Sequence, residues 1–127
     1  MDLKTHPSIS AQWVGEPVEL APGRAVARLQ TRQEMCADGR GLVHGGFAFG
    51  LADYAAMLAV NDPHVVLGAA EVKFLAPVRC GETLTARAQV EEKNGKKRLV
   101  TCSVTSDREV FVGTFTCFVL PGHVLDQ

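Results

Sequence analysis

The chain has 127 residues, of which 46% are hydrophobic and 21% are charged, and its formal net charge is −1. This composition is that of a folded domain of ordinary size and excludes a disordered chain. The small net charge gives no overall electrostatic reason to expect nucleic acid or an anionic membrane as a partner. Since no linker or repeat interrupts the chain, we expect a single domain over residues 1–127.

The first third of the chain is predicted to form two strands, at 12–20 and 24–32. Pro22-Gly23, a turn dipeptide, separates them. In the second segment the small and apolar side chains fall on alternate positions, which is typical of a strand with one buried face. These positions are Ala25, Ala27 and Leu29. A loop rich in turn formers, CADGRG, follows.

The run GLVHGGFAFGLADYAAMLAVN, at 41–61, predicts one long helix over 44–61. It is rich in Ala, Leu, Met and Phe, and Pro63 prevents its continuation. Because the helix is apolar on every side, we expect it to be buried. It falls short of the roughly 20 apolar residues that a membrane span needs, and it carries Asp53 near its centre, so we reject a membrane span.

Four further strands are predicted at 65–78, 83–93, 96–107 and 109–121. Short turn signals separate them, and Asn94-Gly95 is the strongest of these. Consecutive short turns indicate an antiparallel sheet, which we expect to wrap around the helix in an α+β fold. One sheet covers only one side of the helix. The rest of the helix and the open sheet edges therefore indicate a second copy of the chain.

The four cysteines and four histidines show no spacing typical of a metal site, so no metal is expected. The first residues, MDLKTHPSIS, lack the apolar segment of a signal peptide, and we expect reduced thiols and a cytoplasmic location. Cys102 and Cys117 fall within predicted strands, where they should behave as small core residues.

The start of the helix carries His44, Gly45 and Gly46. Backbone N–H groups in the first turn have no intrahelical partner, and the helix dipole adds partial positive charge there. With glycines leaving them open, these groups could stabilise the oxyanion formed when a nucleophile attacks a carbonyl. The glycines could equally serve only a close loop-to-helix junction. For His44 we favour a structural hydrogen bond over a substrate contact or a proton carrier.

Asp53 has two interpretations, because a carboxylate within an apolar helix either finds a partner or has a raised pKa. It is a general base or nucleophile, or it is paired with an arginine or with backbone donors. Gly45 and Asp53 are eight positions apart, about 12 Å along a helix. One carbonyl group cannot contact both within one chain. If both act on a substrate, they belong to different protomers, brought together by an antiparallel pair of helices.

The segment HGGFAFGLAD, from His44 to Asp53, resembles the HGG…AD signature of the hotdog-fold acyl-CoA thioesterases, specifically the PaaI-like group. Asn61 at the helix end and KFLAPVRCGETLTARAQV at 73–90 are further similarities. The resemblance implies a hotdog fold, a sheet of about six antiparallel strands around one long helix. It also implies a homodimer paired along strand 65–76, often doubled to a homotetramer.

The implied activity is hydrolysis of an acyl- or aryl-CoA thioester to the free acid and coenzyme A, with no separate cofactor. In this family pattern, the Gly45 N–H binds the thioester carbonyl, and Asp53 of the other protomer activates water or attacks directly. We expect His44 to support this site. Further substrate contacts are expected at Gly46, Asp38, Leu67, Gly68, Phe74 and Arg79.

The sequence also departs from the family pattern. Asp38 stands where many relatives have Asn, Ala76 where Arg is common, and Leu67-Gly68 where Ser or Thr often assists the carboxylate. By charge alone, the CoA phosphates could meet Arg79, Lys73 or residues 96–98. Two alternatives stay open. One is a non-catalytic acyl-CoA-binding module, and the other, ranked last, is a hydratase-type hotdog enzyme, which would need an Asp and His pair at a short spacing.

Overall fold

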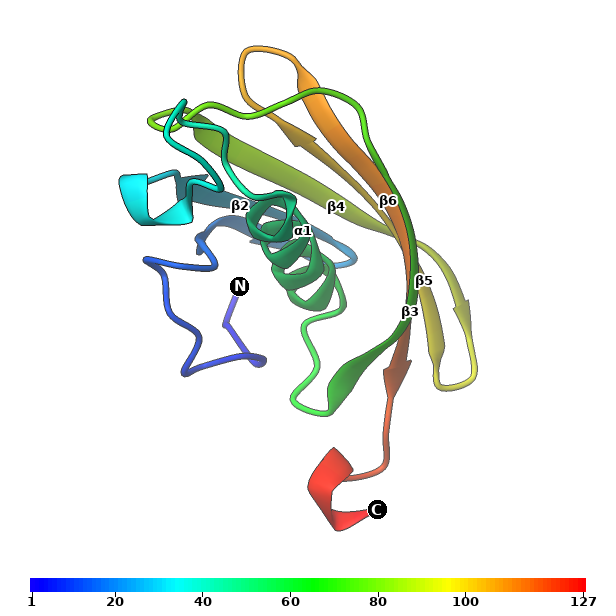
Figure 1. The fold of residues 1–127 in the computed structure, drawn as a ribbon. Coiled ribbons are helices and arrows are strands. Elements are labelled where there is room, and N and C mark those ends of the chain that lie inside the picture. The colour runs from blue at the N-terminus through cyan, green and yellow to red at the C-terminus, as the bar shows by residue number, and fades with distance from the viewer.

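The computed structural model describes residues 1–127 and shows a six-stranded antiparallel sheet curved around one helix (Figure 1). The sheet order is β1-β2-β4-β5-β6-β3, so β1 and β3 are its edges. This confirms the predicted hotdog architecture. The elements are β1 (Glu16–Ala21), β2 (Arg24–Gln30), η1 (Gln33–Met35), α1 (Gly45–Val60), β3 (Val65–Phe74), β4 (Thr83–Asn94), β5 (Lys97–Thr105), β6 (Glu109–Val119) and η2 (Val124–Asp126).

Helix α1 is the centre of the hydrophobic core, as its composition predicts. Its buried residues face β2, β4 and β5, and they are Ala48, Leu51, Ala52, Tyr54, Ala55, Ala56, Met57, Leu58 and Ala59. Asn61 ends the helix as its C-cap, in the left-handed conformation with φ of 49°. No helix in the structure has both the length and the apolar character needed to cross a membrane.

The strands bury alternate side chains against this helix, which confirms the predicted pattern. On β2 the buried residues are Ala25, Ala27 and Leu29, on β4 they are Leu84, Ala86 and Ala88, and on β5 they are Val100, Cys102 and Val104. Cys102 and Cys117 are buried, as expected for small core residues. The turn between β4 and β5 is Gly95-Lys96, with Gly95 at φ +62°, one residue later than the predicted Asn94-Gly95, because Asn94 still belongs to β4 and pairs with Lys97.

Two of the predicted strands are too long by four residues at one end, whereas every other predicted strand end agrees with the structure within two residues. Residues 12–15 were expected in the first strand but precede it, because Val14 donates a backbone hydrogen bond to Ser10 in a helical turn. The third strand ends at Phe74 and not at residue 78. The chain leaves the ladder as it approaches Pro77, a residue that has no N–H to donate.

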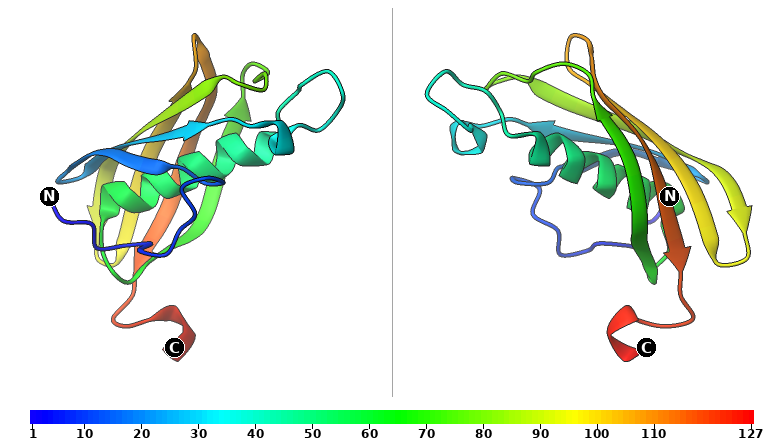
Figure 2. Two further views of the ribbon diagram at one scale, coloured as in Figure 1. Left: turned by 90° about the vertical axis from the view of Figure 1, so that its left-hand side faces the viewer. Right: turned by 45° about the vertical axis from the view of Figure 1, so that its right-hand side comes forward.

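Residues 1–14 run along the helix on the side that the sheet leaves open (Figures 1 and 2). The Asn61 side chain holds this N-terminal segment at two points. Its Oδ1 accepts a hydrogen bond from the Lys4 N–H at 2.8 Å, and its Nδ2 donates to the Asp2 carbonyl at 2.8 Å. The residue that caps the helix therefore also places the N-terminal segment.

Candidate active site

His44 is the N-cap of α1, which is the structural role we favoured for it. Its Nδ1 accepts a hydrogen bond from the Gly46 N–H at 2.9 Å. A Cβ at Gly46 would lie 2.8 Å from that nitrogen, so the cap requires glycine there. The Phe47 N–H donates to the His44 carbonyl at 3.1 Å. Among the first three helical residues, Gly45 is therefore the one whose backbone N–H has no partner in the chain.

The exposed face of Gly45 is bounded by an aromatic ring. A Cβ at Gly45 would lie 3.0 Å from Cε1 of Phe74, the last residue of β3. Phe74 packs edge-on against Phe111 with ring centroids 5.2 Å apart, yet 58% of its surface stays exposed. The free amide of Gly45 and an apolar wall therefore lie together at the start of the helix.

Asp38 and Arg79 flank this end of the helix on neighbouring loops. The Asp38 Oδ1 accepts hydrogen bonds from the N–H groups of Arg40 and Leu42, at 2.9 and 3.2 Å. Leu42 forms a β-bridge with Arg79, whose side chain is exposed. Asp38 thus shapes the loop that leads into the helix, and Arg79 offers a positive charge beside it.

Asp53 is the only residue from Leu51 to Ala59 that is not buried. Within the chain no hydrogen bond or salt bridge reaches its carboxylate, so no arginine or backbone donor of the same chain pairs with it. Burial raises the pKa of Asp53, and the positive charge of His6 opposes this with a smaller effect. An unpaired carboxyl with a raised pKa is typical of a general base.

Asp53 lines a hollow of about 590 Å³. Met57 and Leu67 form part of its apolar lining, and residues 4–7 of the N-terminal segment and His123 also line it. The adjacent Gly68 lies in a β-bulge, where a Cβ would be 2.4 Å from the Phe118 ring. Of the substrate contacts expected in β3, Leu67 is therefore beside Asp53, and Gly68 allows the local packing.

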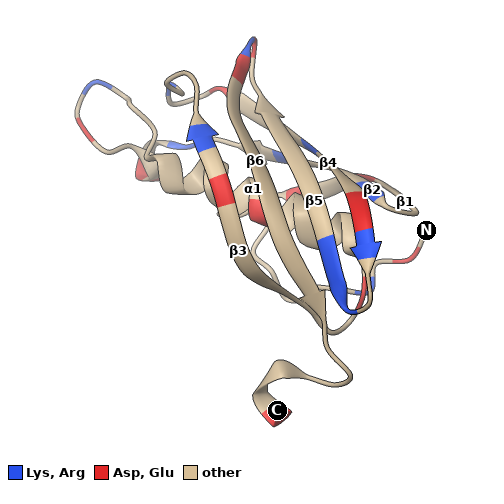
Figure 3. Cartoon of the chain, turned by 90° about the vertical axis from the view of Figure 1, so that its right-hand side faces the viewer, with Lys and Arg blue, Asp and Glu red and all other residues tan.

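The expected site residues fall into two groups within one chain. Gly45, Gly46, Phe74, Asp38 and Arg79 lie at the start of α1. Asp53 and Leu67 lie toward its other end, where β3 begins. β3 runs back along the helix and joins the two groups, and Figure 3 shows it at the sheet edge with no strand beyond it.

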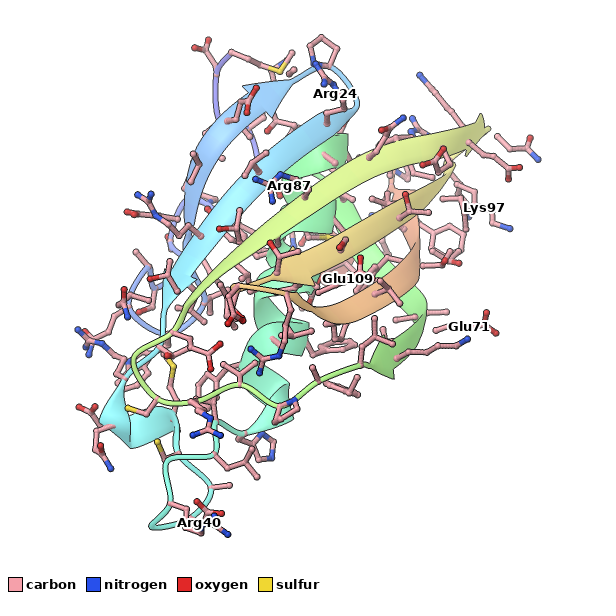
Figure 4. The ribbon with its side chains drawn as sticks, turned by 90° about the horizontal axis from the view of Figure 1, so that it is seen from above. Arg24, Arg40, Glu71, Arg87, Lys97 and Glu109 are labelled. Atoms are coloured by element: carbon pink, nitrogen blue, oxygen red, sulfur yellow. The ribbon has the colours of Figure 1, made fainter.

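A larger hollow, about 1050 Å³, lies elsewhere, on the outer face of the sheet, and includes neither Asp53 nor Gly45. Arg24 and Arg87 line it from β2 and β4, and Glu71 from β3 (Figure 4). Because it is separate from both groups, we do not assign catalysis to it. The basic residues of the sheet that could meet the CoA phosphates lie at two separate places. Lys73 pairs with Val112 on β6, whereas residue 97 pairs with Phe118 near the opposite end of that strand.

Comparison of this chain with known protein families shows which family it belongs to. The family model described as "Thioesterase superfamily" matches residues 40–112, a range that holds both Gly45 and Asp53. The chain belongs to the thioesterase superfamily. Among solved structures, an uncharacterized protein, PH1136 from Pyrococcus horikoshii, superposes with a TM-score of 0.98 at 50% identity, covering 99% of this chain and 98% of that one.

The PaaI protein of the E. coli phenylacetic acid degradation operon superposes with a TM-score of 0.78 at 27% identity. The alignment covers 85% of this thioesterase-superfamily chain and 80% of PaaI. The predicted resemblance to the PaaI-like group is therefore confirmed.

Two curated relatives are longer than the matched region. Methylthioribose-1-phosphate isomerase of Aquifex aeolicus is 50% identical over 123 residues, which are 94% of this chain and 27% of the relative. The transcription factor FapR of Caldanaerobacter subterraneus is 28% identical over 126 residues, 98% of this chain and 63% of FapR. The chain thus spans less than two thirds of the length of either relative.

Sequence reasoning missed His6 and His123, which both line the hollow at Asp53. It also missed the contacts of the Asn61 side chain with residues 2 and 4. These residues are brought together from the two ends of the chain, and no local spacing or periodicity signals such a meeting. For this site, the one indication in the sequence was the apolar run around Asp53, which showed that the Asp53 carboxylate needed an explanation.

Proposed function

We propose that this protein is an acyl-CoA thioesterase, which hydrolyses an acyl- or aryl-CoA to the free acid and coenzyme A in a site shared by two copies of the chain. The observation that carries this proposal is the pair of unpartnered groups on α1, the Gly45 N–H and the Asp53 carboxyl. They are about 12 Å apart along one helix, too far to act on one carbonyl. A second copy supplies the missing half.

The edge strand β3 is suited to pair with its own copy. Its middle residues, Gly68, Ala69 and Ala70, are small and exposed. Antiparallel pairing of two β3 strands places the start of one beside the end of the other. Asp53 and Leu67 of one protomer then approach Gly45 and Phe74 of its partner. The half-buried face of α1, which includes Phe49 and Gly50, gains a cover in the same step.

The reaction follows from these positions. The thioester oxygen accepts a hydrogen bond from the Gly45 N–H, held in place by the His44 cap, and the helix dipole stabilises the developing oxyanion. Asp53 of the other protomer takes a proton from water as the water oxygen bonds to the carbonyl carbon. The carbon–sulfur bond then breaks, and the CoA thiolate leaves and is protonated. Direct attack by the Asp53 carboxylate, through an anhydride that water opens, uses the same geometry.

This sequence of steps calls for no metal and no cofactor besides the CoA within the substrate. Phe74 and Leu67 provide apolar surface for the acyl group, and the exposed charge of Arg79 suits a CoA phosphate. Gly68 and Asp38 keep the surrounding backbone in position through the bulge and the loop. The proposed assembly is a homodimer, or a homotetramer made of two such dimers.

The test is CoA release from a panel of short, medium and aromatic acyl-CoAs, followed with a thiol reagent and corrected for the four cysteines of the chain. The Asp53→Asn variant should lose roughly 10²–10⁴-fold in kcat, the usual worth of a general base. Asp107→Asn is the matched control, since Asp107 lies on the exposed β5–β6 turn. Absence of turnover on every substrate, or equal turnover in wild type and Asp53→Asn, would contradict the proposal.

A second candidate is a non-catalytic acyl-CoA-binding module. Its support is the similarity to FapR, which is named a transcription factor and is matched over 98% of this chain. For this function, calorimetry would detect binding of an acyl-CoA that the wild-type protein leaves intact, with the same affinity in Asp53→Asn. Turnover that depends on Asp53 would eliminate it.

A further inference from the structure

The N-terminal segment brings a histidine to the unpartnered carboxyl of α1. His6 and Asp53 line the same hollow of about 590 Å³, and the positive form of His6 acts on the Asp53 carboxylate. The two residues are 47 positions apart in the sequence. His6 has φ of +53°, a left-handed conformation that is uncommon for residues other than glycine. Such a conformation persists where the surrounding contacts enforce it, often next to a functional site.

Several contacts enforce the position of His6. The preceding Thr5 is 97% buried, with 3% of its surface exposed, and its Oγ1 lies 2.7 Å from the His6 Nδ1. The imidazole ring lies 6.0 Å from the ring of Tyr54, the residue that follows Asp53. The two hydrogen bonds from Asn61 fix the backbone just before this point. Because Nδ1 is engaged with Thr5, Nε2 is the ring nitrogen without a partner in the chain.

Other ionisable groups surround Asp53, but none matches His6. Lys4 and His123 also line the hollow, and the Nδ1 of His123 accepts a hydrogen bond from the Leu125 N–H at 3.0 Å. On β6, burial raises the pKa of Cys117 to about 12, and the charge of Asp53 adds to that shift. Burial also raises the pKa of Tyr54. Only His6 counteracts the effect of burial on the pKa of Asp53.

We propose that His6, delivered by the N-terminal segment, is a positioning residue that keeps Asp53 in its charged, proton-accepting form during thioester hydrolysis. The inference rests on the proposed function and extends it. A carboxylate removes a proton from water only when it is ionised, and burial disfavours that form. A nearby imidazolium favours the ionised form of the carboxylate. Residues 1–14 are then part of the active site rather than an appendage of the fold.

The central variant is His6→Asn, because asparagine tolerates the left-handed conformation while removing the positive charge. Two readouts are needed. The first is an NMR titration of the Asp53 carboxyl in protein with ¹³C-labelled aspartate, assigned with Asp53→Asn. The second is the pH dependence of kcat/KM. In His6→Asn we expect Asp53 to titrate at higher pH and the acid limb of kcat/KM to move with it, so that kcat/KM on that limb falls by roughly three- to tenfold, the effect of losing a charge at close range.

Two further variants separate charge from structure. His6→Lys keeps a positive charge and should retain most of the wild-type kcat/KM on the acid limb, whereas His6→Gln should behave as His6→Asn does. His64→Gln is the matched control, because His64 lies outside the hollow at Asp53. The fluorescence of Trp13, the only tryptophan, reports whether the N-terminal segment stays in place. If His6→Asn displaces the segment, the His6→Gln and His6→Lys pair decides the question.

The outcomes distinguish the two proposals. If Asp53 titrates alike in wild type and His6→Asn, or the pH profile of kcat/KM is unchanged, the role of His6 is overturned while the thioesterase activity stands. That role is also overturned if His6→Lys and His6→Gln lose activity equally, since His6 then acts through structure and not through charge. If the wild type turns over no acyl-CoA, the proposed function fails, and the role of His6 in hydrolysis fails with it.

Discussion

The ring of Phe74 lies against the backbone of Gly45, so that a Cβ added to the glycine would stand 3.0 Å from the ring atom Cε1. This contact joins the end of β3 to the start of α1, next to the one free amide of the helix turn. We expect Gly45→Ala to push the ring aside and to obstruct the approach of a carbonyl oxygen. The predicted loss in kcat is on the order of 10²-fold, comparable to the removal of one oxyanion donor.

The combination Gly45→Ala with Phe74→Ala tells which effect dominates. Removing the ring relieves the crowding, so the double variant recovers activity if the displaced ring caused the loss. If blocked access to the amide causes it, the double variant stays as slow as Gly45→Ala. Steady-state kinetics on one acyl-CoA, with Phe74→Ala alone as reference, provides the comparison. Unimpaired kinetics in Gly45→Ala would contradict a role for this amide.

Mixing two inactive variants tests whether the site is shared. Asp53→Asn and Gly45→Ala chains, unfolded together and refolded as a mixture, form mixed dimers in which one site has both an intact Asp53 and an intact Gly45. Random pairing makes half of the dimers mixed, each with one intact site of two, so about a quarter of the wild-type activity should return.

Each variant refolded alone is the control for this mixture and should stay inactive. A mixture that remains inactive, although sizing chromatography and mass spectrometry show mixed dimers, would place both groups of one site within one chain. A strictly monomeric wild type would also defeat the shared site.

The unpaired carboxyl of Asp53 should make the protein less stable at neutral pH. Its pKa when folded is raised above the ordinary 3.8, so the folded state binds the proton more tightly than the unfolded state. The free energy of unfolding then falls as pH rises through the raised pKa, and the full penalty applies above it. Asp53→Asn should therefore raise Tm at pH 7, by roughly 2–5 °C.

Calorimetric melts over a pH series check this expectation. The gain from Asp53→Asn should shrink as pH falls through the raised pKa and disappear below 3.8, where Asp53 is protonated in both states. Asp107→Asn serves as the comparison, because the hydrogen bond from Arg108 lowers the pKa of Asp107. A gain for Asp53→Asn that does not vary with pH would show that its ionisation is not the cause.

Local pattern was enough to predict most of the fold. The continuous apolar run predicted α1, and alternation at Ala25, Ala27 and Leu29 predicted the buried face of β2. Asp53 was identified because a charge in that run conflicts with its burial. The engagement of the Gly46 amide by His44 depends on the His44 ring orientation, which spacing does not specify. The approach of His6 to Asp53 depends on the path of the N-terminal segment, and that path is set by tertiary contacts alone.

Asn61 has two roles that substitutions can separate. It ends α1 in the left-handed conformation, with φ of 49°, and its side chain holds residues 2 and 4. Asn61→Gly keeps the conformation and removes both side-chain hydrogen bonds, so we expect a loss of about 1–3 kcal/mol in the free energy of unfolding. Asn61→Ala also strains the backbone at positive φ, which adds about 1 kcal/mol.

Denaturant melts give the two stabilities, and Trp13 fluorescence reports the N-terminal segment, since the Arg32 guanidinium lies 5.9 Å from the centre of the Trp13 ring. Both variants should loosen the segment to the same extent while differing in stability. Because the segment carries His6, both should also shift the acid limb of kcat/KM to higher pH, as His6→Asn does. A shift in Asn61→Ala but not in Asn61→Gly would trace the effect to the helix end, and the N-terminal segment would then have no part in setting the charge of Asp53.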